Sequence, residues 1–475
     1  MYLPKQSKVT LYQKRQNRQK KSKIILLFWN VAFLSLSTLY QNHQKHPTSL
    51  KTSPKTSNIS QNITKSHKSH RGRGHNNNME EAFEVLQLSN LTRRRKDVAK
   101  KNRRGNRIRN RSHALHEMDS IDDKMFKKMF RMSRHAFTNL LDILEEHFEE
   151  RDARSVRQAQ NSSGSVISSK TALAVTLRWL AGASYIDLCF SWGISMGSFY
   201  ADDGVLWGTM DAINEAFDIG LPLTDSRELS KIAREYSYYS YGHITNVVSA
   251  IDGWVCRTRC PTYDEVMFPA HYRNRKGFFG IVVIAGCDSN LRFNIFSSKC
   301  SGATHDSLAW EVAAAKHLII DEKKLPAQFV VIGDEAFVTS DQLWTPWSGH
   351  SLDEWKDAFN YYLSAMRQCI ERAFALLTQK WGVFWRPLRC AHDRWPLVCM
   401  VAAKLHNYCI DMEEDQNDME RFEEDVEDGD VHCLNFNQCL NSVSLEERRP
   451  SGDSRRRMTK YFETHGVRRV KARRY

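Results

Sequence analysis

Apolar residues recur at helical spacing in the segment 125–148, where positions three and four apart predict amphipathic helices with a break near Ser133. A second helical block follows a polar linker. It ends in a short helix at 184–192 and a longer helix at 195–213, joined by a turn that contains Gly193. A short helix, a turn and a longer helix are the elements of a helix-turn-helix.

From residue 243 onward the pattern changes to short stretches rich in β-branched and aromatic residues, which are typical of strands. We predict strands at 243–252, 277–288, 291–300 and 329–337 and helices at 304–320 and 360–381. Apolar positions three and four apart give the last helix a core-facing stripe. The stripe consists of Leu363, Met366, Ile370, Phe374, Leu377 and Trp381.

These patterns divide the chain into four regions. A basic leader at 1–112 is too polar to bury a core, so we expect it to be largely disordered. An all-α, helix-turn-helix-like domain follows at 113–225. An α/β domain then covers 240–412, with a mixed sheet of five strands and flanking helices, and 413–475 forms an acidic and then basic disordered tail.

The balance of charge and the cysteines narrow the functional class. The 475 residues contain 69 Lys and Arg against 55 Asp and Glu, a net charge of +14 that favours polyanions such as nucleic acid as partners. The eleven Cys form no regular framework, so we interpret them as reduced thiols of an intracellular protein.

An apolar run at 24–40 supports an alternative. It follows a basic stretch and resembles a signal peptide or a short anchor. The run is short for a membrane span, and unpaired cysteines and basic tails fit secretion badly, so we expect no membrane association. Whether 24–40 is an anchor or an irrelevant apolar run stays open.

Three acidic residues lie where a catalytic metal site would need them. Asp252 and Asp334 each end a predicted strand beside a Gly, and Glu371 lies within the long helix. Strand ends bring side chains to one rim of a sheet, and a helix across that rim can add a third carboxylate. Such oxygen ligands suit Mg²⁺ or Mn²⁺, and two ions about 3.5–4 Å apart can activate water against a phosphodiester.

Each acidic residue also has a structural interpretation. Asp beside Gly is common in turns, Glu371 could pair with Arg367 one helical turn earlier, and Asp306 could cap the helix that begins beside it. The order of strands and helices, with carboxylates in these places, is nevertheless how an RNase H-like nuclease is built.

Six stretches in this order resemble the DDE endonuclease domain of PIF/Harbinger-type transposases and of nucleases derived from them. They are AIDG, YRNRKGFFGIVVIAGCD, SGATHDS, VIGDEAF, NYYLSAMRQCIERAFALL and KLHNYCID. The resemblance implies an RNase H-like domain in which Asp252, Asp334 and Glu371 are catalytic and bind the metal ions, with Asp306 as a further ligand. It implies DNA cleavage at transposon ends and strand transfer to target DNA.

The resemblance also implies partners. These are DNA carrying terminal repeats, target DNA, a Myb-like DNA-binding protein and a second copy of the chain, in the nucleus. The presumed recognition helix carries Asp202 and Asp203 and has no Lys or Arg from 195 to 213, so DNA affinity would come from elsewhere. The candidate nucleic-acid contacts are Arg93, Arg94, Arg95, Lys96, Lys100, Lys101, Arg103, Arg104, Arg273, Arg275 and Lys276.

The runner-up hypothesis is a domesticated, catalytically silent protein that binds DNA or chromatin. A silent relative is free to lose its carboxylates, and here all three stand in place. Neither the cognate DNA sequence nor the oligomeric state can be read from these residues.

Overall fold

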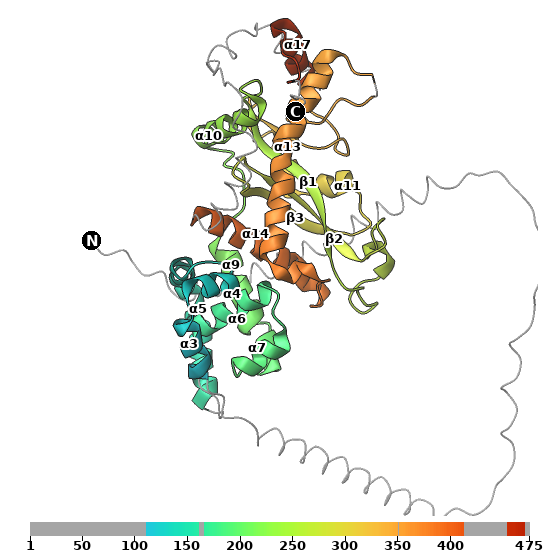
Figure 1. The fold of residues 1–475 in the computed structure, drawn as a ribbon. Coiled ribbons are helices and arrows are strands. Elements are labelled where there is room, and N and C mark those ends of the chain that lie inside the picture. The colour runs from blue at the N-terminus through green and yellow to red at the C-terminus, as the bar shows by residue number, and fades with distance from the viewer. Residues whose placement is uncertain (1–110, 161–165, 350, 413–453, 471–475) are drawn as a thin grey trace, which may run out of the picture. The chain divides into compact units, whose positions relative to one another are not determined.

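A five-stranded mixed sheet lies at the centre of the residues that the computed structural model describes, which are 111–160, 166–349, 351–412 and 454–470 (Figure 1). The strand order is β3-β2-β1-β4-β5, with β1 to β3 antiparallel and β4 and β5 parallel to β1. A mixed sheet of five strands with flanking helices is the predicted arrangement and is compatible with an RNase H-like domain. The strands are β1 Val247–Arg257, β2 Gly280–Cys287, β3 Phe293–Ser301, β4 Val330–Ile332 and β5 Leu343–Trp344.

Two strand boundaries differ from the prediction. Asp252 does not end β1 but lies in its middle, because the second half of β1 continues to pair with β2 as far as Arg257. In contrast, β4 stops at Ile332, so that Asp334 lies in the turn beyond it. The short strand β5 falls in a Trp- and Pro-containing connection where the sequence pattern predicts no strand.

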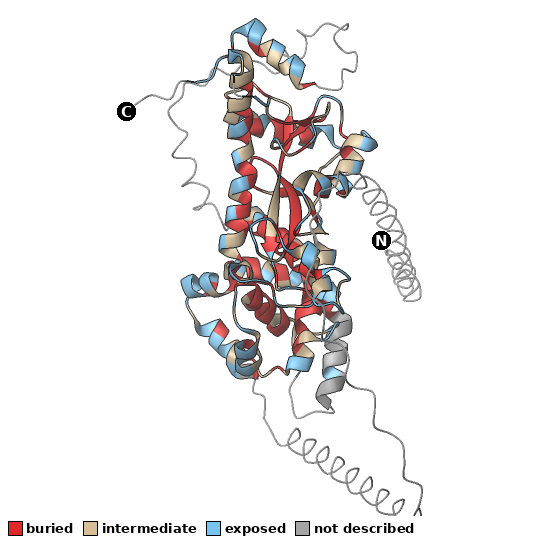
Figure 2. Cartoon of the chain, turned by 90° about the vertical axis from the view of Figure 1, so that its right-hand side faces the viewer, coloured by how far each residue is buried: buried red, intermediate tan, exposed pale blue. Residues whose placement is uncertain are grey.

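The long helix α13 (Glu354–Lys380) packs against β1 and β2 and runs across the sheet in Figure 1. Its N-cap Asp353 accepts a hydrogen bond from the Lys356 backbone amide at 2.8 Å. All six residues of the predicted apolar stripe are buried, which confirms the predicted core-facing side. Figure 2 shows the buried inner side of this helix and the buried strands.

Two helices are held to the strands by hydrogen bonds as well as by apolar packing. In α10 (Ser226–Ser237), the Tyr236 hydroxyl donates to the Cys287 carbonyl at 2.6 Å and accepts from the Ala250 amide at 3.1 Å. In α14 (Trp395–Asp411), the Asn407 side chain bonds both the amide and the carbonyl of Phe293, at 2.8 and 2.7 Å. These contacts satisfy buried polar groups, which would otherwise destabilise the fold.

Helices also fill the described residues before the sheet. The predicted break at Ser133 is confirmed, because the Ser133 hydroxyl accepts from the Ala136 amide at 3.1 Å, beside the start of α5. The predicted helix at 304–320 is instead broken into α11 Asp306–Glu311, α12 Ala314–Lys316 and a π-helical turn at His317–Asp321. The other helices are α3 Arg111–Ser120, α4 Asp123–Phe130, α5 Arg134–Gln160, α6 Ser169–Leu180, α7 Tyr185–Ser191, α8 Met196–Tyr200 and α9 Val205–Ala216.

The helix-turn-helix interpretation is not supported. The helix predicted at 195–213 is divided into α8 and α9 at Gly204, where a Cβ atom would lie 2.6 Å from the Ser198 carbonyl oxygen. Moreover, α9 is buried on several sides against α5, α6 and α14, so it is not available for a DNA groove. The prediction failed because a short helix, a turn and a longer helix also occur in helical hairpins that pack within a core.

Helix α14 contacts both the N-terminal helices and the sheet. Its Lys404 ammonium group donates to the carbonyl and side-chain oxygens of Asn214, and the Tyr408 hydroxyl donates to the Ala136 carbonyl at 2.6 Å. The described helices at 111–216 are therefore packed onto the residues that carry the sheet.

Part of the predicted disordered tail forms a helix. Helix α17 (Arg455–His465) packs on α13, with Phe462 fully buried. The indole nitrogen of Trp344 donates to the Ser454 hydroxyl at 2.6 Å, and that of Trp347 donates to the Thr459 hydroxyl at 2.9 Å. The prediction for 413–475 is thus wrong over this segment, because one aromatic anchor and two indole hydrogen bonds outweigh its basic composition.

Some predictions lie outside the described residues, namely those for the leader up to residue 110 and for 413–453. The apolar run at 24–40 belongs to this group. Within the part of the chain that the structure describes, none of the helices has the length and apolar character needed to cross a membrane.

Replacing Phe462 by Ala should detach α17, because removing a buried Phe side chain costs about 3–5 kcal/mol. We expect a lower Tm and faster proteolysis within 454–470. The exposed Glu463→Ala on the same helix is the matched control and should behave like the parent protein. Equal proteolysis rates for the two variants would contradict the docking of α17.

A buried carboxyl group should make stability depend on pH. Asp288 follows β2, and burial raises its pKa from 3.8 to about 6. Because the unfolded chain then ionises at a lower pH than the folded one, stability should fall by up to about 3 kcal/mol as the pH rises from about 4 to about 6. Urea unfolding of Asp288→Asn across this range should lack that decrease, whereas the exposed Asp264→Asn should retain it.

Candidate active site

Two of the predicted carboxylates are level with one another on adjacent parallel strands. Ala250 of β1 pairs with Ile332 of β4, and Asp252 and Asp334 each lie two residues further along. Asp252 lies within β1 and Asp334 in the turn beyond β4, and the register brings them close enough for the charge of Asp334 to raise the pKa of Asp252. The backbone holds both: Gly253 donates its amide to Asp252 at 2.7 Å, and Ala336 donates to Asp334 at 2.9 Å.

Asp306 approaches β1 next to Asp252, from the start of α11. Its carboxylate lies against the backbone of Gly253, at the position that a Cβ atom on residue 253 would occupy. Any larger residue at 253 would therefore have to displace Asp306. The Gly beside Asp252, which the sequence suggested as a turn residue, instead makes room for a third carboxylate in the middle of a strand.

Glu371 is connected to this group through Arg367. Both residues belong to α13, and the Arg367 Nη2 atom lies 3.9 Å from Asp252 Oδ2 and 3.9 Å from Glu371 Oε1. The Glu371 side chain is 62% exposed, whereas that of Arg367 is 15% exposed. The Glu371 carboxylate therefore has room to rotate, while Arg367 is held between the helix and the sheet.

The proximity of the carboxylates changes their ionisation. Burial raises the pKa of Asp252, and the nearby Asp334 and Asp306 raise it further, against the Gly253 hydrogen bond and Arg367. The pKa of Asp306 is also raised, by burial first and then by Asp334, while His305 and Arg275 lower it. Asp252, Asp306 and Asp334 therefore form one like-charged cluster that a cation would stabilise.

The three side chains have the donor atoms that a divalent cation prefers, but their arrangement in the structure is not that of a metal site. Carboxylate oxygens are the ligands that Mg²⁺ and Mn²⁺ prefer. Among the residues that the structure describes, however, no three Asp, Glu, His or Cys side chains are close enough together to hold a metal ion. Arg367 lies between Asp252 and Glu371, so full ligation would require Glu371 to turn towards the cluster.

The predicted nucleic-acid contacts are only partly within the described structure. Arg273, Arg275 and Lys276 are exposed in the segment before β2, and Arg275 is close enough to Asp306 to lower its pKa. The other eight, at 93–104, lie outside the described residues.

Two residues contribute to the site in ways that the sequence did not indicate. The spacing of Arg367 and Glu371 suggested their pairing, but the contact of Arg367 with Asp252 depends on how α13 crosses β1. The role of Gly253 likewise depends on where α11 begins in space. Glu335 beside Asp334 is exposed.

Removing one charge from the cluster should stabilise the metal-free protein. In EDTA at neutral pH we expect Asp306→Asn to raise the Tm by about 2 °C, because like charges are no longer held together. Ionisation of Asp306 destabilises the folded state as the pH rises through its raised pKa, so this gain should disappear at acidic pH. The exposed Glu335→Gln removes a charge nearby and should leave the Tm unchanged; an equal rise there would contradict the cluster.

A comparison with known protein families agrees with this geometry. Residues 251–407 match the family model described as DDE superfamily endonuclease. No curated protein and no solved structure gives a significant match to the chain. The matched segment contains Asp252, Asp306, Asp334 and Glu371, and the match supports a transposase-like nuclease of the DDE type.

Proposed function

We propose that this protein is a Harbinger-type DDE transposase, or a nuclease derived from one, that hydrolyses DNA phosphodiester bonds with Mg²⁺ or Mn²⁺. The observation that carries the proposal is the proximity of Asp252, Asp306 and Asp334, whose charges act on one another, within the segment that resembles DDE endonucleases. The Harbinger type itself rests on the ordered sequence stretches and not on the fold.

The residues that would hold the metal ions are Asp252, Asp334 and Glu371, with Asp306 as a further ligand. When bound, two such ions supply activation of water and stabilisation of the leaving oxygen of the phosphodiester. The chain itself orients the ligands: the Gly253 and Ala336 amides hold Asp252 and Asp334, and Arg367 lies between Asp252 and Glu371. A 3′-hydroxyl of cleaved DNA in the place of water would give strand transfer.

The location of the protein, its DNA substrate and its partners belong to the same proposal. A nuclear location, terminal repeats as the DNA substrate, a Myb-like partner and a homo-oligomer follow from the resemblance and from the basic composition of the chain. The N-terminal helices do not provide the DNA-reading helix that such a protein needs, so a separate DNA-binding partner fits the structure.

A second candidate function is a silent DNA- or chromatin-binding protein derived from such a nuclease. One observation favours it: no three acidic side chains are assembled into a metal site among the described residues, and Arg367 already neutralises part of the acidic charge. The two candidates differ in whether divalent ions bind the cluster and whether DNA is then cut.

The test is cleavage of supercoiled plasmid DNA that carries the terminal repeats of the source element. Nicking should require Mg²⁺ or Mn²⁺ and should stop in EDTA. Asp334→Ala should lower the rate by at least about 100-fold, since losing even an outer hydrogen-bond partner of a metal ligand costs 10–100-fold.

Glu335→Ala is the matched control, because it removes the adjacent carboxylate and should keep the parent rate. Cleavage by Asp334→Ala at the parent rate would refute the assignment of the site. Intact DNA with the parent protein, together with no change in Tm on adding millimolar Mg²⁺ or Mn²⁺, would favour the silent DNA-binding protein.

A further inference from the structure

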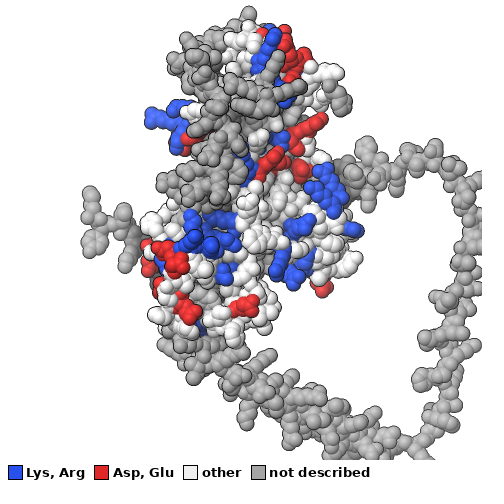
Figure 3. Space-filling model, in the orientation of Figure 1, with Lys and Arg blue, Asp and Glu red and all other residues white. Residues whose placement is uncertain are grey.

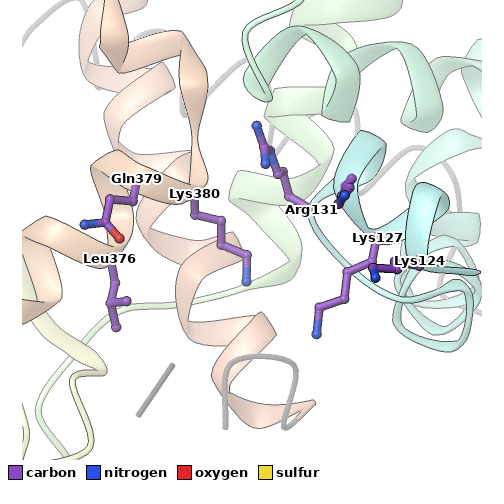
Figure 4. A pocket seen from close by; sticks show the side chains of 7 residues that line it. Lys124, Lys127, Arg131, Leu376, Gln379 and Lys380 are labelled. Carbon is purple, nitrogen blue, oxygen red and sulfur yellow. The ribbon is translucent and has the colours of Figure 1, made fainter. Parts of the chain in front are cut away.

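A basic pocket of about 380 Å³ opens between helix α4 and the C-terminal end of α13 (Figure 4). Five of its seven lining residues are cationic and none is acidic. In Figure 4, Lys127 of α4 and Lys380 of α13 extend into the space between the two helices from opposite sides. The lining residues are Lys124, Lys127, Lys128, Arg131, Leu376, Gln379 and Lys380.

The sequence of α4 explains why its lysines face outward together. Phe126 and Phe130 are buried and fix one side of the helix against the core. Lys124, Lys127 and Lys128 lie at the remaining positions and are exposed. Positions three and four apart lie on the same side of a helix, so Lys124 is close to both other lysines.

Arg131 adds a further cation to the lining of the pocket. It ends α4 in the left-handed conformation, at φ 66°, and its Nε atom is buried and has no hydrogen-bond partner in the structure. Burial lowers the pKa of Arg131, and burial and the positive charge of Arg131 lower that of Arg178. The charged groups here are thus desolvated and repel one another, a state that a bound anion relieves.

Helix dipoles account for only part of these charges. Cations favour helix C-termini, and both α4 and α13 end at the pocket. Each C-terminus is equivalent to about half a negative charge, so two of them offset about one of the five positive charges. A concentration of cations of this kind favours a polyanion as the ligand.

The pocket and the carboxylates are connected through helix α13. Glu371 and Lys380 are on the same helix, nine residues apart, which corresponds to about 13 Å along its axis. Nine residues are also about two and a half helical turns, so the two side chains leave α13 on opposite sides. Figure 3 shows acidic side chains on this face of the molecule, with clusters of Lys and Arg beside and below them.

We propose that this pocket binds the phosphodiester backbone of the DNA substrate. The inference rests on the proposed function, which supplies DNA as the substrate. The pocket contacts phosphates and reads no bases, so it positions the duplex without selecting its sequence. In this arrangement the N-terminal helices contact DNA through the pocket and not through the buried helix α9.

Salt dependence of DNA binding tests the proposal. Affinity of the full-length protein would be measured in EDTA at a series of salt concentrations, with two duplexes of unrelated sequence. The triple variant Lys124→Gln, Lys127→Gln and Lys128→Gln should lower the slope of log K against log salt by up to about 2.7, since each lost phosphate contact removes about 0.9. Both duplexes should lose affinity equally.

A matched triple variant controls for the loss of net charge. Lys231→Gln, Lys323→Gln and Lys324→Gln removes three exposed lysines that do not line the pocket, and its slope should stay at the parent value. Equal slopes for the two triple variants would overturn the proposal.

Two substitutions at one exposed residue test the proposal by strengthening and by weakening DNA binding. Gln379→Lys adds a cation to the last turn of α13 and should steepen the slope by about 0.9, whereas Gln379→Glu should weaken binding to both duplexes. No change in either direction would again overturn the proposal.

The outcome is separate from that of the nuclease test. Binding is measured in EDTA and therefore does not depend on cleavage. A lower salt slope for the pocket variant, together with no cleavage by the parent protein, would refute the nuclease proposal and support the pocket proposal. Metal-dependent cleavage that Asp334→Ala abolishes, together with an unchanged salt slope for the pocket variant, would support the nuclease proposal and refute the pocket proposal.

Discussion

The parallel pairing of β1 with β4 is the constraint on which the candidate site depends. It aligns Ala250 with Ile332 and so brings Asp252 level with Asp334, although 82 residues separate them along the chain. Two carboxylates close together raise the free energy needed to ionise each of them, and Asp306 adds a third carboxylate. The fold tolerates this repulsion because apolar contacts elsewhere are extensive, including the fully buried β2 and the inner side of α13.

Arg367 shows how the chain manages an acidic cluster when no cation is bound. A guanidinium group near both Asp252 and Glu371 partly neutralises them and keeps their side chains apart. A divalent ion would compete with Arg367 for the same oxygens. The balance between the two decides whether this cluster is a catalytic centre or only a remnant of one, and Glu371 is the side chain free enough to change partners.

The N-terminal helices acquire a different role from the one that their sequence suggested. Helix α9 is a core element that joins α6 and α5 to α14, and hydrogen bonds from Lys404 and Tyr408 fasten the helices to the residues that carry the sheet. What these helices present to solvent near α13 is the basic side of α4. Contact with DNA phosphates through this side would need no recognition helix.

The sequence by itself determined the elements whose signals are local. Stretches rich in β-branched and aromatic residues predicted the three long strands, and the apolar stripe predicted the inner side of α13. The ordered stretches from AIDG to KLHNYCID indicated a DDE-type nuclease and named four acidic residues. Each of these signals depends only on neighbours in the chain.

Only the tertiary structure decided which residues meet. The end of β4, the start of α11 against Gly253, the contact of Arg367 with Asp252, and the docking of α17 through Phe462 all depend on packing between distant segments. The burial of α9 is the same kind of fact, because an apolar helix does not specify its partner. Local patterns set the elements of this protein, whereas long-range packing set which charges are brought together and which basic surface is left exposed.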